Sequence, residues 1–363
     1  MKLTIVAGAR PNFIKIAPII KAIKLSNRLD YRLIHTGQHY DDKMSKIFFE
    51  QLEIPTPDCN LKVGSGSQAE QTAKIMISFE NELLNYKTDI VIVVGDVNST
   101  MACAIVAKKM NIKVAHVEGG IRSNDSTMPE EINRIVTDSI TDYFFTTSKT
   151  ANRNLIVSGV KKSSIFFVGN TMIDTLLEFK DKFIKPIFWD DLKLKKQSYI
   201  LLTLHRPANV DEEYKLKNFI SEIIKNSRNC KIIFPVHPRT KKIIESLDVN
   251  DSNLVQLEPL SYLEFNYLTK NAKIVITDSG GITEETTVMG IPCITLRDNT
   301  ERPETVTLGT NELIGTNPKS IKQALDKLFN NKWKKGSIPE LWDGLTSKRI
   351  IDVLLKLEKD ICL

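Results

Sequence analysis

The chain has 363 residues, of which 42% are hydrophobic and 26% are charged, and its 50 basic and 44 acidic side chains give a formal net charge of +6. This length fits two domains of ordinary size, each with enough apolar residues to form a core. The small positive balance suits anionic ligands, but the one dense basic run, at 332–335, has no interleaved aromatic stripe, so we expect no nucleic-acid partner.

Cysteine usage and the start of the chain predict a compartment. The five cysteines are odd in number and widely separated, and they lack metal-ligand spacing, so we expect reduced thiols and no bound metal. No charged leader with an apolar stretch and cleavage site precedes the first apolar run, and no run is long enough to span a bilayer. The expected location is the cytoplasm, without a membrane partner.

Short apolar, β-branched runs alternate with amphipathic helical stretches, which is typical of parallel sheets built from βαβ units. The expected strands are 3–7, 31–35, 90–94, 113–117, 143–147 and 165–168, followed by 199–204, 231–236, 253–257, 273–277, 293–296 and 312–314. The predicted fold class is α/β, with two Rossmann-like doubly wound parallel-sheet domains facing a central cleft. We expect an N-terminal domain at 1–172, a C-terminal domain at 173–345 with a hinge near 178–197, and a final helix at 346–363 that packs back on the N-terminal domain.

The turn after the first strand carries two cations. Gly8, Ala9, Arg10 and Pro11 form this turn, with proline set for the first helical position, and Lys15 follows one helical turn later. Arg10 and Lys15 could be solvated helix residues. Their position directly after the first strand favours instead a pair of cations that binds phosphate.

A glycine-rich segment at 64–69 matches the dinucleotide pattern G-x-G-x-x-G/A. It follows only the short apolar run 61–63, and Glu80 and Glu82 fall late in the next helix instead of at a strand end. We therefore expect no dinucleotide cofactor, and indeed no cofactor of any kind.

Acidic residues follow several predicted strands and one helix start. Asp96 comes after 90–94, Glu118 ends 113–117, and Glu130 and Glu131 lie at a helix start with Arg134 one turn on. Any one of these acids could be a helix cap or a surface residue, and for Glu131 that reading is favoured. Three acids at one sheet edge would raise one another's pKa, which keeps a carboxyl group available as a proton donor.

All five histidines fall within or just after a predicted strand. His35 and His116 lie inside apolar runs and are the better candidates for structural roles. The other three are His39, His205 and His237.

The segment 277–304 predicts a nucleotide diphosphate site. A β-branched run ends in Asp278 and Ser279, and the paired Gly280 and Gly281 open a helix. Free N–H groups at a helix start and the helix dipole favour a phosphate, and glycine lets it approach the backbone. Acids one turn inside this helix would repel a phosphate but suit the hydroxyls of a ribose.

These motifs together resemble the non-hydrolysing UDP-N-acetylglucosamine 2-epimerases, which have the GT-B fold. The resemblance lies in GARPNFIK (8–15), GDVNST (95–100), HVEGGIRS (116–123), MPEEINR (128–134), GNTMIDT (169–175), LHRPAN (204–209), TDSGGITEE (277–285) and RDNTERPE (297–304). The resemblance implies an isomerase that interconverts UDP-N-acetylglucosamine and UDP-N-acetylmannosamine, which supplies a precursor for surface polysaccharides. The expected assembly is a homodimer.

Carried over by position, the resemblance implies two groups of site residues. The catalytic group around the sugar is Lys15, Asp96, Glu118, Glu130 and His205. The substrate-binding group is Arg10, Arg134, Arg206, His237, Ser279, Gly280, Gly281, Glu285 and Arg302.

Two departures from the family pattern bear on the substrate. At 205–209 this chain has His-Arg-Pro-Ala-Asn where the family often has His-Arg-Arg-Glu-Asn, so one cation and one acid near the diphosphate are absent. Regulated bacterial members carry a further glutamine after the pair matching Gln38 and His39, whereas Tyr-Asp-Asp follows here at 40–42, which argues against a regulatory second substrate site. Segment 35–58 looks as much like 2-epimerases of UDP-2,3-diacetamido-glucuronic acid, so the sugar stays open.

Carbon 2 of an N-acetylhexosamine has no adjacent carbonyl, so direct loss of its proton would leave an unstabilised carbanion. Departure of UDP from carbon 1 acidifies that proton, and elimination gives UDP and a 2-acetamidoglucal, to which UDP adds again after protonation from the opposite face. This chemistry needs a firm hold on UDP and proton-transfer groups on both faces of the sugar. A GT-B glycosyltransferase would share the UDP site without needing three carboxylates at the sugar.

Overall fold

A computed structural model describes residues 1–38, 42–236, 240–241, 243–244 and 251–361 of the chain. The candidate residue His237 and the residues His39, Tyr40, Asp41 and Cys362 lie outside this part. The chain divides into two compact units, the first made of Met1–Glu178 and Glu340–Leu363 and the second of Phe179–Pro339.

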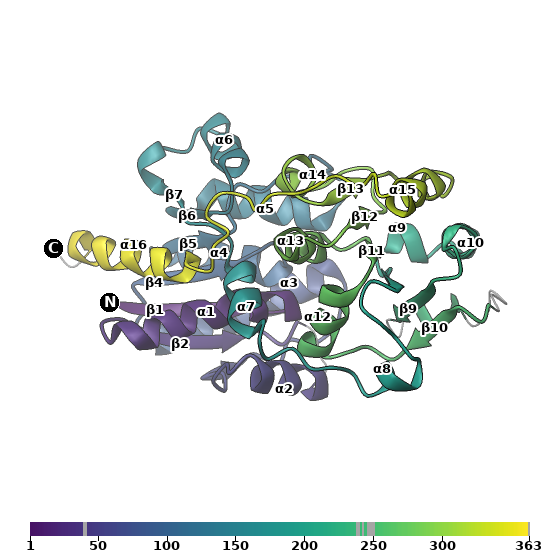
Figure 1. Ribbon diagram of the computed structural model, residues 1–363. Coiled ribbons are helices and arrows are strands. Elements are labelled where there is room, and N and C mark those ends of the chain that lie inside the picture. Colours follow the sequence, from purple (N-terminus) through teal and green to yellow (C-terminus); the bar gives the residue numbers. More distant parts are fainter. Residues whose placement is uncertain (39–41, 237–239, 242, 245–250, 362–363) are drawn as a thin grey trace. The chain divides into compact units, whose positions relative to one another are not determined.

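The first unit contains a parallel sheet with the described strands in the order β3-β2-β1-β4-β5-β6-β7 (Figure 1). This is the doubly wound order, in which β1 and β4 are parallel neighbours and the strands are added outward from them in opposite directions across the sheet. The strands are β1 (Lys2–Ala7), β2 (Asp30–His35), β3 (Cys59–Asn60), β4 (Ile90–Val94), β5 (Lys113–Val117), β6 (Tyr143–Thr146) and β7 (Ile165–Phe167). The helices are α1 (Arg10–Ser26), α2 (Asp42–Gln51), α3 (Gln68–Asn85), α4 (Asn98–Lys109), α5 (Pro129–Ile140), α6 (Lys149–Val157), η1 (Lys162–Ser164), α7 (Thr171–Phe179) and α16 (Thr346–Ile361).

The core of the first unit explains why its central strands are continuous apolar runs. All five residues of β4 are buried, because helices cover both faces of a parallel sheet. On one face, Val91 and Val93 pack with Phe79 of α3 and Ala102 of α4.

The C-terminal helix α16 belongs to the first unit and packs against α1 (Figure 1). The buried carboxylate of Asp174 accepts hydrogen bonds from the backbone N–H groups of Thr346 (3.0 Å) and Ser347 (2.6 Å), which satisfies donors at the start of α16. Trp342, which lies just before this helix, is buried and donates its Nε1–H to the carbonyl of Thr147 (3.0 Å).

The second unit repeats the same winding with the described strands in the order β10-β9-β8-β11-β12-β13, all parallel. Its strands are β8 (Tyr199–Thr203), β9 (Lys231–Pro235), β10 (Leu254–Leu257), β11 (Ile274–Thr277), β12 (Cys293–Thr295) and β13 (Asn311–Leu313). Its helices are α8 (Phe188–Asp191), α9 (Pro207–Val210), α10 (Glu213–Asn226), α12 (Tyr262–Asn271), α13 (Gly280–Met289), α14 (Pro303–Thr307) and α15 (Ser320–Phe329). Helices α10 and α15 contribute to the core on one face, and α12 with Trp189 on the other.

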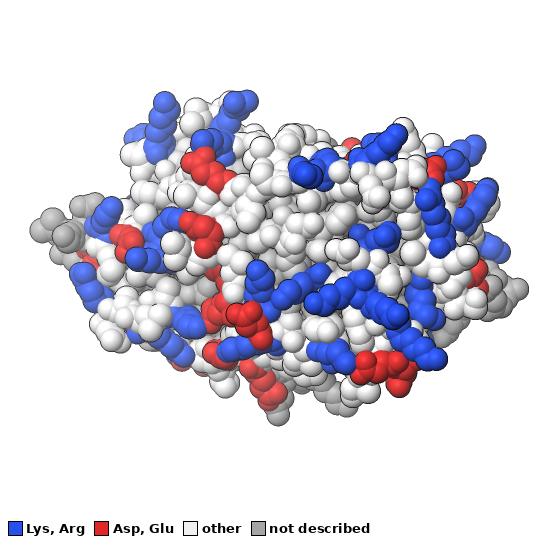
Figure 2. Space-filling model, in the orientation of Figure 1, with Lys and Arg blue, Asp and Glu red and all other residues white. Residues whose placement is uncertain are grey.

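Each of the twelve predicted strands is present, with ends shifted by no more than one residue. The two-residue strand β3 was not predicted, because Cys59 and Asn60 form no apolar run. None of the described helices is both long and apolar enough to cross a membrane. On the face shown in Figure 2, acidic side chains lie among the lysines and arginines.

Candidate active site

Polar candidate residues gather where the winding of each sheet reverses. In the first unit, β1 pairs with β4 and β4 with β5, and the register places Val94 opposite Val117, so Asp96 and Glu118 leave neighbouring strands at the same edge. In the second unit, β8 pairs with β11, and Thr203 lies opposite Thr277. Ligands of doubly wound sheets bind outside the carboxyl ends of strands at such reversal points.

The first buried contact of this edge is an ion pair. The Nζ of Lys15, from α1, lies 2.6 Å from Oε2 of Glu118, and both side chains are buried. A Cβ placed on Gly95 would lie 3.2 Å from that Nζ and 3.9 Å from that carboxylate oxygen, so the backbone that leads into Asp96 passes directly over the pair. Gly95 has a φ of +71°, which glycine adopts without cost.

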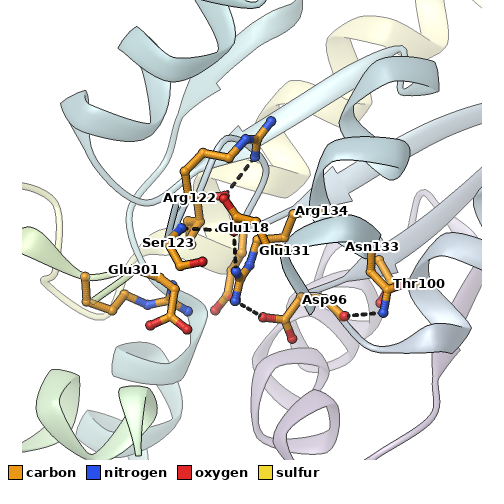
Figure 3. A network of polar contacts seen from close by, with 12 residues as sticks. Asp96, Thr100, Glu118, Arg122, Ser123, Glu131, Asn133, Arg134 and Glu301 are labelled. Atoms are coloured by element: carbon orange, nitrogen blue, oxygen red, sulfur yellow. Dashed lines mark hydrogen bonds and ion pairs between the residues drawn. The ribbon is translucent and has the colours of Figure 1, made fainter. Parts of the chain in front are cut away.

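Arg134 of α5 joins two further carboxylates, as Figure 3 shows. Its Nη2 contacts Oδ2 of Asp96, and its Nη1 lies 2.7 Å from Oε2 of Glu131. The backbone N–H groups of Ser123 and Asn124 also donate to Glu131, each at 2.9 Å. Although burial favours the neutral form, these hydrogen bonds and the charge of Arg134 together hold the pKa of Glu131 below its usual value.

This arrangement differs from the expected group of mutually repelling acids. Lys15 and Arg134 are buried among the carboxylates, so Asp96, Glu118 and Glu131 each contact a cation. Glu131, for which a helix-cap or surface role was favoured, is buried and fixes the segment before α5. The side chain of Asp96 keeps 27% of its surface exposed and so can meet a ligand.

Asn133 and Asn98 tie the Asp96 segment to α5 and α3. The Nδ2 of Asn133 donates to the carbonyl of Asp96 (2.9 Å) and to Oδ1 of Asn98 (3.2 Å). Asn98 in turn donates to the side-chain carbonyls of Gln68 (2.7 Å) and Gln71 (2.9 Å) at the start of α3. Segment 64–69 therefore leads into the start of α3, where the side-chain carbonyls of Gln68 and Gln71 hold Asn98. Ser67 caps that helix.

In the second unit, Asp278 organises the residues that follow β8. Its carboxylate lies 3.0 Å from Nδ1 of His205 and accepts the backbone N–H of Arg206 (3.0 Å) and the Nδ2–H of Asn209 (3.2 Å). The backbone carbonyl of Asp278 accepts from Nε of Arg206 (3.0 Å). Burial opposes the charged form, but His205 and the N–H donors outweigh it, and the pKa of Asp278 is lowered. His205 itself is 49% exposed.

The start of α13 is suited to an anion. Ser279 is its N-cap residue but makes no capping hydrogen bond with its side chain, so this residue leaves the first N–H groups of the helix uncovered. A Cβ on Gly280 would have its nearest neighbours at Oε2 of Glu301 (3.7 Å) and Nη1 of Arg297 (4.0 Å). Arg297 lies 2.7 Å from Glu301, and Arg206 lies 3.5 Å from the same carboxylate. Arg297 was not among the predicted residues.

The two acids inside α13 point to separate partners. Glu284 forms a buried ion pair with Nε of Arg302. Glu285 accepts the hydroxyl of Tyr262 (2.9 Å) and lies 3.4 Å from Nδ2 of Asn266. Burial raises the pKa of Glu285 to about 7, against the opposing effect of the Tyr262 hydroxyl.

Glu285 gives a prediction for stability against pH. Its pKa in the folded protein is about 7, above the ordinary value of 4.5, so the folded state binds this proton more tightly than the unfolded state does. The contribution of Glu285 to stability is therefore complete below pH 4.5 and is lost as pH rises through 7, a change of about 3 kcal/mol. Glu285→Gln removes this dependence.

The measurement is the free energy of unfolding of both proteins at pH 5 and pH 8. From pH 5 to pH 8 the parent should lose more stability than the variant, so the difference in unfolding free energy shifts in favour of the variant. An equal difference between the two proteins at both values would contradict the assignment.

The remaining predicted residues are placed as follows. Arg10 begins α1 and Glu130 lies in the first turn of α5, both partly exposed. His35 is buried and stacks on Phe13 at 5.3 Å, and His116 is buried between Asp138 and the carbonyl of Gly95.

Comparison with known proteins settles the family. The sequence model described as UDP-N-acetylglucosamine 2-epimerase matches residues 21–355. The chain belongs to the UDP-N-acetylglucosamine 2-epimerase family. A UDP-N-acetylglucosamine 2-epimerase of Methanocaldococcus jannaschii is 44% identical, with 98% of this chain and 99% of that protein covered.

A solved structure and one further relative bear on fold and substrate. A crystal structure of the M. jannaschii UDP-GlcNAc 2-epimerase in complex with UDP-GlcNAc and UDP aligns with a TM-score of 0.89 and 43% identity, covering 98% of this chain and 100% of that one. A UDP-2,3-diacetamido-2,3-dideoxy-D-glucuronate 2-epimerase of Pseudomonas aeruginosa is 38% identical over 98% of this chain and 100% of its own length.

The family confirms the expected fold class, two Rossmann-like doubly wound domains of the GT-B type, and the expected enzyme class, an isomerase. A glycosyltransferase is not favoured, because the matching family and the M. jannaschii relative at 44% identity are named epimerases.

Proposed function

We propose that this protein interconverts UDP-N-acetylglucosamine and UDP-N-acetylmannosamine by eliminating UDP and adding it again. The observation that carries the proposal is the set of paired carboxylates at the end of the first sheet, where Asp96 and Glu118 lie beside Arg134 and Lys15. An N-acetylhexosamine needs such groups for proton transfer at carbon 2. The proposal is also supported by the M. jannaschii relative named for this activity and by its structure in complex with UDP-GlcNAc.

In the first unit we assign the sugar chemistry. Asp96, Glu118 and Glu130 supply the acid and base roles, with Lys15 fixing Glu118 and Arg134 fixing Asp96. The cations of Lys15 and Arg134 hold these two carboxylates in place, which suits groups that transfer a proton at carbon 2. In the second step a proton-transfer group on the opposite face of the sugar gives a proton to carbon 2 of the glycal as UDP adds to carbon 1.

In the second unit we assign the binding of UDP. The start of α13 with Gly280 and Gly281 binds the diphosphate, and Glu285 accepts hydrogen bonds from the ribose. His205 and Arg206, held by Asp278, stabilise the charge that develops as the diphosphate leaves. Ser279 and Arg302 complete the proposed set of the second unit. For Arg10, which belongs to the first unit, we propose a substrate-binding role as well. We propose the same role for His237.

The role of Asp278 is tested by Asp278→Asn. The amide loses the charge that faces His205 and presents a donor to the N–H donors around it, so UDP binding should weaken by about tenfold to a hundredfold. Titration calorimetry with UDP measures this change. The control is Asp326→Asn, on the exposed surface of α15, which should bind UDP as the parent does. Equal affinity in Asp278→Asn and the control would refute the assigned role.

The reaction itself is tested by incubating the purified protein with UDP-N-acetylglucosamine and no acceptor, followed by NMR and mass spectrometry. The expected product is a UDP-sugar of unchanged mass that is epimeric at carbon 2. Free sugar with UDP would indicate a hydrolysing enzyme. Turnover only of the diacetamido-glucuronate substrate would move the assignment to the activity of the P. aeruginosa relative.

We further propose a homodimer and a cytoplasmic location. Ile132 and Ile135 lie one turn apart on α5 and are each 50% exposed, so together they form a small apolar surface that suits an interface between copies. The double variant Ile132→Glu/Ile135→Glu should be monomeric by light scattering, whereas the parent should have twice the mass of one chain. A monomeric parent would refute the proposed dimer.

The proposed cytoplasmic location is supported by the four described cysteines, which are free thiols, as is usual in a reducing compartment.

A further inference from the structure

A buried polar network lies behind the two acids of the first unit. His116 of β5 is fully buried, and its Nδ1 lies 2.7 Å from Oδ1 of Asp138 while its Nε2 lies 2.8 Å from the carbonyl of Gly95. Asp138 of α5 also accepts the backbone N–H of Gly120 (3.0 Å) and the Nη1–H of Arg122 (2.6 Å). None of His116, Asp138 and Arg122 belongs to the set of residues predicted to touch the substrate.

Each end of this network meets one of the proposed catalytic segments. The carbonyl of Gly95 belongs to the peptide that leads into Asp96, and the N–H of Gly120 lies two residues after Glu118. His116 therefore joins the segment after β4 to the segment after β5 through Asp138. Figure 3 places Arg122 in the same group of side chains as Glu118 and Asp96.

The segment after β5 needs such support, because its backbone is in an unfavourable conformation. Glu118 has a φ of +72°, in the left-handed region that residues with a side chain seldom adopt. Gly119 packs between Phe144 and the network, since a Cβ there would lie 3.0 Å from the Phe144 ring, 3.4 Å from Oδ1 of Asp138 and 3.5 Å from Nδ1 of His116. The hydrogen bond from Gly120 to Asp138 then fixes the far side of the turn.

The surroundings of Asp138 also determine its charge. Burial favours the neutral form of Asp138, but His116 and Arg122 outweigh it, and the pKa of Asp138 is lowered, so this group is a carboxylate. The two ring nitrogens of His116 contact this carboxylate and the carbonyl of Gly95. His116 consequently holds both partners at once.

We propose that His116, Asp138 and Arg122 form a positioning network that sets the placement of Asp96 and Glu118 for proton transfer at carbon 2. The inference rests on the proposed function and adds residues that act through the two acids without touching the substrate. Because a misplacement of about 1 Å can cost about a hundredfold in rate, loosening this network should lower kcat while leaving UDP binding intact.

Two matched variants separate the ends of the network. In His116→Asn the amide nitrogen takes the place of Nδ1, which preserves the contact with Asp138 and loses the one with Gly95. In His116→Gln the amide nitrogen reaches the place of Nε2, which preserves the contact with Gly95. We expect kcat to fall by about tenfold to a hundredfold in His116→Asn, with partial rescue in His116→Gln. UDP affinity should stay within about twofold in both.

A structural role alone would not produce two further results. Misplaced acids return the proton to carbon 2 slowly, so His116→Asn should release more free UDP and 2-acetamidoglucal per turnover than the parent. Arg122→Met, which leaves the pair of His116 and Asp138 in place, should show a smaller loss of kcat and serves as the variant of choice if the histidine variants do not fold.

Hydrogen exchange monitored by mass spectrometry gives a readout that does not depend on activity. Peptides that contain Gly120 should exchange at least about tenfold faster in Asp138→Ala than in the parent, because their N–H loses its acceptor. Unchanged kcat per UDP-binding site in His116→Asn, or unchanged exchange in Asp138→Ala, would overturn the inference. If the parent does not epimerise the substrate, but exchange at Gly120 is faster in Asp138→Ala than in the parent, the result counts against the proposed function and not against the network.

Discussion

Replacement of Asp96 by asparagine is expected to lower the rate of epimerisation by about a thousandfold, within the range that proton-transfer groups contribute. The asparagine carbonyl can still accept from Arg134, so the segment after β4 keeps its anchor, but the side chain can no longer take up a proton. The diphosphate and ribose contacts assigned to the second unit are untouched. UDP should therefore bind as it does to the parent.

Two measurements on the same preparation check this expectation. Coupled or NMR assays give the rate of epimerisation, and calorimetry gives the UDP affinity and the number of sites. Asp125→Asn, in the segment before α5, is the matched control and should retain parental rates. If Asp96→Asn loses UDP binding but the sites that still bind UDP turn over at the parental rate, Asp96 is not the proton-transfer group that we assign.

Loss of the Lys15–Glu118 pair should remove both activity and stability, and the two effects can be separated. Glu118→Leu takes away the carboxylate that lies 2.6 Å from the buried Nζ of Lys15, and breaking a buried pair on one side costs about 3–5 kcal/mol. The double variant Lys15→Met/Glu118→Leu leaves no buried ammonium and should recover most of that stability. Neither variant should epimerise the substrate at a measurable rate.

Urea unfolding and activity assays on the single and double variants test this expectation. Glu178→Gln is the control, because Glu178 pairs with Lys21 on the exposed surface of the same unit and should change stability by about 1 kcal/mol or less. Activity in the stable double variant would rule out a catalytic role for the pair. A double variant as unstable as the single one would mean that packing, not charge, explains the loss.

The sequence predicts the architecture well because fully buried parallel strands have an unmistakable composition. β4 is a run of five isoleucines and valines, and its residues are all buried. The reversal point of each sheet follows from strand order, so the neighbourhood of Asp96 and Glu118 could be predicted from their places after β4 and β5.

The partners of the site residues could not be predicted in the same way. That Arg134 contacts Asp96 depends on how α5 is rotated against the sheet, which strand patterns do not determine. Its contact with Glu131, three residues earlier on the same helix, follows from helical spacing alone. The separate partners of Glu284 and Glu285 lie 18 and 23 residues away, at Arg302 and Tyr262.

Asp278 is a different case, because the signal for it was present. It follows the buried strand β11 directly, as Asp96 follows β4 after one glycine, and the same rule would have marked it. The pattern for a phosphate at the following helix start predicts Ser279 and the two glycines, but it assigns no role to Asp278.

The central claim, that this enzyme breaks and remakes the bond between carbon 2 of the sugar and its hydrogen, is tested most directly in heavy water. UDP-N-acetylglucosamine incubated with the protein in D2O should acquire one deuterium, at carbon 2, in both epimers, and NMR locates it. An epimerised product that retains its original hydrogen at carbon 2, or a UDP-sugar that is never altered under these conditions, would contradict the account.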